Sequence, residues 1–199
     1  MSIFGLILLG VGGFALYKFI SAGKARQDTK NLPKKATITA LTASGDKTVL
    51  GLAINDIFQH TGQDFMVEGK LIYREGGDEW WEYRLVDGAD EAYLSVEDDD
   101  ELEVALWREI QFDVPSSGPP ESLVWEGDKY RCAERGEASV TRDGKTGRKS
   151  GLTCKYWDYE GPGGKMVGIE QWGGGYEVWS GEELEEGRYD ILPGDLIED

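Results

Sequence analysis

The sequence predicts an all-β fold in which two similar antiparallel β-meanders pack together, as a sandwich or a partly open barrel, after one N-terminal transmembrane helix. Three observations lead to this fold class. Apolar and polar residues alternate in short segments, glycine-rich turns separate those segments, and an uncharged apolar run opens the chain. Of 199 residues, 28 are glycine, which suits many tight turns between short strands.

The first residues have the character of a membrane anchor. Residues 3–17 carry no charge, and Lys18, Phe19 and Ile20 extend the run to the short end of what spans a bilayer core. A cleaved signal peptide is the alternative, but the residues before the apolar run carry no basic side chain. We therefore expect a retained helix that contacts the lipid bilayer through residues 3–20.

A basic stretch follows the anchor and predicts its orientation. The positive-inside rule places the N-terminus outside and the C-terminal domain in the cytoplasm, as a single-pass membrane protein. We expect the basic side chains to lie along the anionic inner leaflet as well as to set the topology. They are Lys24, Arg26, Lys30, Lys34 and Lys35.

The cytoplasmic placement bears on the two cysteines, Cys132 and Cys154. We expect reduced thiols there, with a disulfide between them as the alternative. His60 is the only histidine, so a zinc site of two cysteines and two histidines cannot form. The sequence predicts no metal, no cofactor and no catalytic residue.

The net charge of −17 constrains the partners. Because the bases concentrate beside the anchor, the body of the chain is still more acidic and would repel nucleic acids. We expect no nucleic acid as partner, and instead a basic protein or a polycation.

Period-two alternation predicts the strands. In the first half the candidate strands are 36–43, 65–75, 80–87, 91–97 and 101–110. In the second half they are 128–142, 154–160, 165–172, 176–181 and 188–194. Turns are expected at 76–77, 87–88 and 173–175, and the acidic run 97–101 is expected to be a solvated turn rather than a calcium loop.

The two halves resemble each other, which predicts an internal repeat. Residues 81–83 read Trp-Glu-Tyr, and residues 157–159, 76 positions later, read Trp-Asp-Tyr. The expected regions are an anchor helix at 1–23, a basic juxtamembrane linker with an entry strand at 24–46, a first meander at 47–113, a linker at 114–122 and a second meander at 123–199.

Strand parity divides the aromatic residues between two faces. We expect the side chains of one face to form cross-strand core pairs, namely Trp81, Tyr83, Trp157 and Tyr159. The opposite face then supplies a candidate interaction surface, namely Trp80, Tyr156 and Trp172.

The run V-E-G-x-L-x-Y-R-E-G-G-x-x-W-x-E-Y-x-L at 67–85, followed by Y-L-S-x-E at 93–97, resembles the bacterial family called domain of unknown function 4178. Y-W-D-Y at 156–159, I-E-x-W at 169–172 and W-S-G-E-E-L at 179–184 are similar to its C-terminal portion. The resemblance implies an all-β domain without assigned activity or catalytic residues. It also implies a membrane-stress or polyamine-related context.

Three functions remain open. The leading hypothesis is a membrane-anchored, non-enzymatic interaction or scaffold module. The second is a sensor that binds small cations such as polyamines, since acidic and aromatic groups together can enclose a cation. The third is a hydrolase that uses carboxylates, for which no nucleophile and no acid–base pair can be identified.

Overall fold

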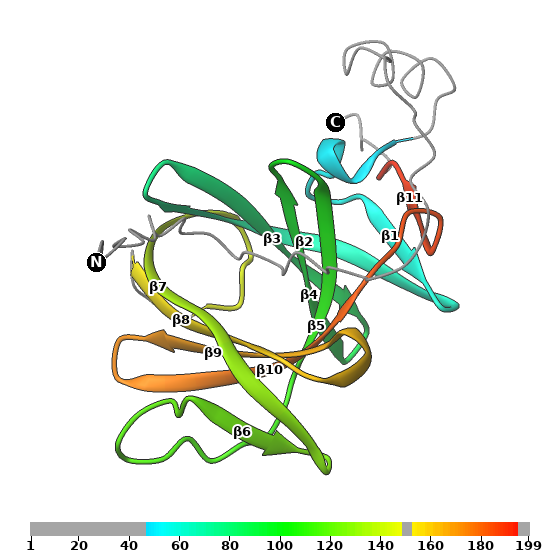
Figure 1. Cartoon of the computed structure of the whole chain (residues 1–199). Helices are drawn as coiled ribbons and strands as arrows, with labels where there is room; N and C mark the ends of the chain where they lie inside the picture. Colours follow the sequence, from blue (N-terminus) through cyan, green and yellow to red (C-terminus); the bar gives the residue numbers. More distant parts are fainter. Residues whose placement is uncertain (1–46, 149–152, 195–199) are drawn as a thin grey trace, which may run out of the picture.

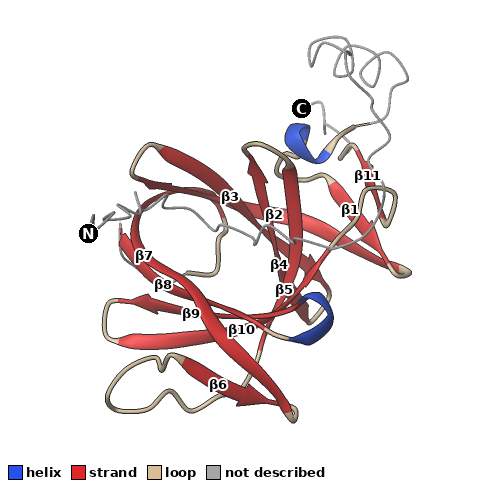
Figure 2. Ribbon diagram, in the orientation of Figure 1, coloured by secondary structure: helices blue, strands red, loops and turns tan. Residues whose placement is uncertain are grey.

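The computed structural model describes residues 47–148 and 153–194, which form an antiparallel sheet of eleven strands and two short 3-10 helices (Figures 1 and 2). The expected anchor at 1–23, the basic residues after it and the expected strand at 36–43 lie outside the described residues. Among the residues that are described, no helix is both long and apolar enough to cross a bilayer.

The elements follow one another along the chain in this order: η1 (Val49–Gly51), β1 (Ile57–His60), β2 (Gln63–Glu75), β3 (Asp78–Asp87), β4 (Asp90–Asp98), β5 (Leu102–Glu109), β6 (Ser122–Trp125), β7 (Asp128–Gly144), β8 (Thr153–Glu160), η2 (Pro162–Gly164), β9 (Lys165–Trp172), β10 (Gly175–Glu183) and β11 (Tyr189–Leu192). The turns expected at 76–77, 87–88 and 173–175 connect β2 to β3, β3 to β4 and β9 to β10. The short strands β1 and β6 were not predicted from the sequence.

Eight of the strands close into a barrel. Hydrogen-bonded neighbours follow the order β2, β3, β4, β5, β10, β9, β8 and β7, and β7 then pairs with β2 to complete the ring. The all-β, antiparallel prediction is confirmed. The expected sandwich or partly open barrel is wrong, because the two meanders join edge to edge at both junctions and leave no open edge between them.

Three strands lie outside the ring. β11 and β1 extend the sheet beyond β2, and β6 extends it beyond β7, so they lie at opposite margins of the molecule in Figure 1. A bulge in β2 between Val67 and Gly69 shifts its side-chain alternation at the point where its pairing passes from β1 to β7.

Apolar side chains fill the barrel and also cover parts of its outside. The interior cluster includes Tyr73, Trp80, Trp107, Tyr156 and Trp179. One outer cluster packs β2–β5 against η1, β1 and β11, and a second packs β8–β10 against β6 and residues 110–114. Many strands are therefore buried on both faces, unlike the half-exposed strands of a simple meander.

The two halves of the ring are equivalent in topology. Exchanging β2 with β7, β3 with β8, β4 with β9 and β5 with β10 preserves every neighbour in the ring. Because β5 and β10 run antiparallel, as do β2 and β7, the exchange also swaps the two ends of the barrel. A feature at one end of the first half thus has its counterpart at the other end of the second half.

Candidate functional site

One end of the barrel is lined by carboxyl groups, and strand register places them there. Side chains alternate between the inside and the outside along a barrel strand. Glu97 lies opposite Glu103, Glu183 lies opposite the interior residue Ala105, and Glu134 lies opposite Asp158. We call this set the acidic mouth; it consists of Glu97, Glu103, Glu134, Asp158 and Glu183.

The carboxyls of Glu97 and Glu103 are crowded and only partly solvated. One oxygen of each, Oε2, is out of contact with solvent and has no hydrogen-bond partner among the described residues. Burial and then the charge of Glu103 raise the pKa of Glu97 to about 8. Burial and then the charge of Glu183 raise the pKa of Glu103 to about 7. Both groups therefore titrate near neutral pH.

Asp158 lies deeper in the barrel than the glutamates. Both of its carboxyl oxygens are out of contact with solvent and find no hydrogen-bond partner in the described part of the chain. Burial, followed by the charges of Glu134 and Glu170, raises the pKa of Asp158 well above its ordinary value.

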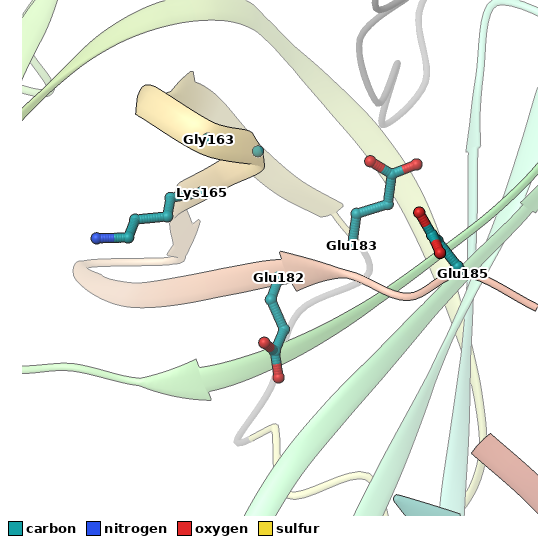
Figure 3. Close-up of a pocket in the computed structure, with 6 residues that line it drawn as sticks. Gly163, Lys165, Glu182, Glu183 and Glu185 are labelled. Carbon is teal, nitrogen blue, oxygen red and sulfur yellow. The ribbon is translucent and has the colours of Figure 1, made fainter. Parts of the chain in front are cut away.

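A surface hollow of about 350 Å³ adjoins the acidic mouth and shares Glu183 with it. Figure 3 shows the side chains of Glu183 and Glu185 on one side of the chain at residues 182–185 and the side chain of Glu182 on the other side. The hollow is also lined by Gly163, Gly164 and Lys165. Nζ of Lys165 lies 2.7 Å from Oδ2 of Asp128, so this base is already engaged.

Four carboxyls of the acidic mouth have no counter-charge among the described residues. No ion pair joins Glu97, Glu103, Asp158 or Glu183 to a base within residues 47–148 and 153–194. In the same residues, no cluster of histidine, cysteine and acidic side chains has an arrangement suited to a metal ion. A cationic group from outside would therefore meet several uncompensated carboxyls.

Elsewhere in the barrel, a second acidic pair is compensated by the chain itself. Arg148, which follows β7, places its guanidinium inside the barrel, 2.7 Å from Glu170 and 3.6 Å from Glu82. It also bonds to Glu177. Tyr73 donates a hydrogen bond either to Glu82 at 2.8 Å or to Glu170 at 3.1 Å, so this pair is well satisfied.

Aromatic rings complete the surroundings of Arg148. The central guanidinium carbon lies 4.3 Å from the ring centre of Tyr93, 4.4 Å from that of Trp179 and 5.6 Å from that of Trp172. Burial opposes the charge on Arg148, but Glu170, Tyr73 and Glu82 outweigh burial and raise its pKa well above the ordinary value. This is a cation held by carboxylates and aromatic rings in the protein interior.

The candidate aromatic surface does not form as expected. Trp80 is 0% exposed and Tyr156 is 1% exposed, and both belong to the cluster inside the barrel. Trp172 is half-buried, and its indole N–H donates to Glu170 at 3.2 Å. The assignment of Trp80 and Tyr156 to an exposed surface is wrong, because closure of the barrel turned their strand faces inward.

The opposite faces of the same strands pack outside the barrel. Tyr83 and Tyr159 are buried there, as predicted, whereas Trp81 and Trp157 are half-buried at the edges of the two outer clusters. The two aromatic repeats thus occupy equivalent positions on β3 and β8.

His60 and the two cysteines occupy structural positions in the fold. His60 is buried, and its Nδ1–H donates to the carbonyl of Arg188 at 2.9 Å. Cys132 and Cys154 are both free thiols, and Cys154 lies inside the barrel. The five basic residues assigned to the membrane surface lie outside the described residues.

Sequence reasoning missed the acidic mouth and Arg148. From the sequence, Glu97 is expected only as part of a solvated turn, and Asp158 only as the middle of an aromatic repeat. The repeat itself carried a usable signal, because it places an acid at the same position of each half.

Comparison with known proteins gives a family without an assigned activity. The family model described as Domain of unknown function (DUF4178) matches residues 53–186. Uncharacterised proteins of Mycobacterium bovis and of two Mycobacterium tuberculosis strains are each 31% identical over 146 residues, which cover 69% of this chain and 69% of each relative. No solved structure gives a significant match.

Proposed function

This chain belongs to the family described as Domain of unknown function (DUF4178), which assigns no activity, and from the geometry of its own barrel we propose that it is a non-enzymatic interaction module whose acidic mouth binds a basic protein. The observation that carries this proposal is the crowding of carboxyls at one barrel end, where Glu97, Glu103 and Glu183 pair with no base in the described part of the chain. Like charges in a partly buried site destabilise the free domain. A cationic partner would relieve that repulsion, which favours binding.

The proposed setting is the inner face of a membrane. It rests on the apolar run at 3–20 and on the bases after it, which are features of the sequence alone. Membrane fractionation of the full chain and of a chain lacking residues 1–23 tests the anchor. Recovery of both in the soluble fraction would overturn it.

Charge-neutralised variants test the docking site. The triple variant Glu97→Gln, Glu103→Gln and Glu183→Gln removes three carboxyls of the acidic mouth. A matched control, Asp87→Asn, Asp90→Asn and Asp113→Asn, removes three exposed carboxyls, two from the ends of β3 and β4 away from the mouth and one from the segment after β5. The full chain of each variant, expressed in its native host, is compared by in-cell crosslinking and purification.

We expect a crosslinked basic protein with the wild type and the control, and at least a tenfold lower yield with the mouth variant. Equal yields from all three chains would overturn the proposal, because the partner would then recognise another surface.

A second candidate is a sensor of small cations such as polyamines. It is favoured by the hollow beside the acidic mouth, whose volume of about 350 Å³ lies in the range of small-molecule sites. Calorimetric titration of the full chain with spermidine at physiological salt tests it. Saturable binding that the mouth variant loses and the control keeps supports the sensor, and equal weak heats from both exclude it.

A further inference from the structure

The two halves of the barrel carry acids at equivalent positions. Glu82 on β3 corresponds to Asp158 on β8, since each is the central residue of its aromatic repeat. Glu97 ends the apolar run of β4, and Glu170 does the same on β9. When the two halves are exchanged, Asp158 takes the place of Glu82 and Glu97 takes the place of Glu170. The pair Glu82 and Glu170 therefore has the pair Asp158 and Glu97 as its counterpart.

The first of these pairs holds a cation and shows what such a pair recognises. The guanidinium of Arg148 lies 2.7 Å from Glu170 and 3.6 Å from Glu82, with the ring of Trp179 against it at 4.4 Å. Arg148 reaches this position from the connection after β7. The equivalent connection, from β2 to β3, is the two-residue turn of Gly76 and Gly77, which contains no arginine.

The second pair also has an aromatic neighbour, but no base among the residues that the structure describes pairs with it. Trp107 on β5 lies inside the barrel near this pair, although the strand register makes Ala105 the counterpart of Trp179. A methyl group at Gly168 would lie 3.4 Å from the Trp107 ring and 3.7 Å from Oδ1 of Asp158, so ring and carboxyl are neighbours. Both oxygens of Asp158 are buried and have no hydrogen-bond partner among the described residues.

We propose that the acidic mouth receives the arginine side chain of its basic partner, with the guanidinium bound between Asp158 and Glu97 as Arg148 is bound between Glu82 and Glu170. This inference rests on the proposed function and names the group that the partner inserts. A planar guanidinium offers five donors and can serve two carboxylates while it stacks on a ring, which a lysine ammonium cannot do equally well.

Protonation gives the site a measurable signature. Glu97 holds a proton at neutral pH, because burial and then the charge of Glu103 raise its pKa to about 8. A guanidinium that binds beside it favours the ionised carboxylate and so expels that proton. Binding should therefore release protons to the buffer.

The test is calorimetric titration of the full chain, in detergent, with ethylguanidinium chloride at low millimolar concentrations. Titrations in two buffers of different ionisation enthalpy measure proton release. Asp158→Asn is the test variant, Glu97→Gln a second variant in case the first fails to fold, and Asp87→Asn the matched control. Ethylammonium chloride is the comparison ligand.

We expect saturable ethylguanidinium binding with proton release in the wild type and the control. Affinity should fall at least tenfold in Asp158→Asn or Glu97→Gln, the proton release should disappear in Glu97→Gln, and ethylammonium should bind more weakly. No saturable binding to the wild type, or unchanged binding in both variants, would overturn the inference.

The two proposals fail separately. If the partner crosslinks through the mouth but ethylguanidinium does not bind, the interaction module stands and arginine insertion is wrong. If ethylguanidinium binds at Asp158 but no partner depends on the mouth, arginine recognition stands and the protein partner is wrong.

Discussion

Glu97 and Glu103 lie directly opposite each other on neighbouring strands, at the inner face of one end of the barrel. Like charges at directly opposed positions of an antiparallel pair are destabilising. The part of the chain that the structure describes offers no base to either carboxyl. Repulsion between these carboxyls therefore lowers the stability of the barrel at this end. We propose that a bound cationic partner relieves this repulsion.

This cost predicts a pH dependence of stability. Burial, followed by the charges of Glu103, Asp99, Glu134 and Asp78, raises the pKa of Glu97 from 4.5 to about 8. Between these values the folded chain binds more protons than the unfolded chain, so the free energy of unfolding falls as pH rises from about 4.5 to 8. Chemical denaturation at several pH values measures the fall.

Glu97→Gln removes part of that dependence. At pH 8 we expect the variant to be more stable than the wild type by on the order of 1 kcal/mol, a value discounted because the side chain is partly solvated. At pH 4 the two should be equal, since the glutamate is then protonated. Asp87→Asn, in an exposed turn, should leave the pH profile unchanged, and an equal effect of the two substitutions would contradict this prediction.

Arg148→Ala should destabilise the fold strongly. It leaves Glu82 and Glu170 in the interior without their cation, and breaking a buried pair in this way costs about 3–5 kcal/mol. Arg74→Ala is the matched control, because its pair with Glu79 is exposed and should be worth at most about 1 kcal/mol. Urea denaturation compares them, and equal losses would contradict the account of the Arg148 site.

Gly181→Ala tests the packing of the barrel. A methyl group at Gly181 would lie 2.5 Å from the Trp107 ring, which is buried and cannot move aside without disturbing the core. We expect a loss of about 1–3 kcal/mol from overpacking. Gly174→Ala, where no atom lies within 4 Å, should change the midpoint of thermal unfolding little.

The two thiols should differ in reactivity. Cys154 is buried in the barrel, and burial followed by the charge of Glu170 raises its pKa strongly. Cys132 is half-buried outside the barrel. With a thiol reagent at pH 8 we expect the native protein to be labelled at Cys132 first and at Cys154 only after unfolding, and equal rates would contradict the placement of Cys154.

The sequence predicted the strands of both meanders, because alternation and glycine turns are local properties. The faces of those strands were harder to assign. Trp80 and Trp81 alternate correctly, but η1, β1 and β11 cover the outside of β2–β5, so both faces of β3 meet apolar neighbours. Parity alone cannot say which face closes inward, and Trp80 was placed on the wrong one.

The acidic mouth depends on pairings between distant parts of the chain. Glu183 reaches Glu103 only because β10 pairs with β5, and Glu134 meets Asp158 only through the pairing of β7 with β8. Nothing in the local sequence around Glu97 indicates that it points into a barrel. The repeat of an acid within the two aromatic triplets was visible, but its meaning required the closed ring.

The most direct test of the account places a photocrosslinker beside the mouth. Leu102, the first residue of β5, is 44% exposed beside the mouth, and Met66, on β2 at the other end of the barrel, is 45% exposed. With the full chain in its native host, we predict that a crosslinker at position 102 captures a basic protein, that one at position 66 does not, and that the Glu97, Glu103 and Glu183 substitutions abolish the capture. Equal capture at both positions, or capture at 102 that survives those substitutions, would contradict recognition through the acidic mouth.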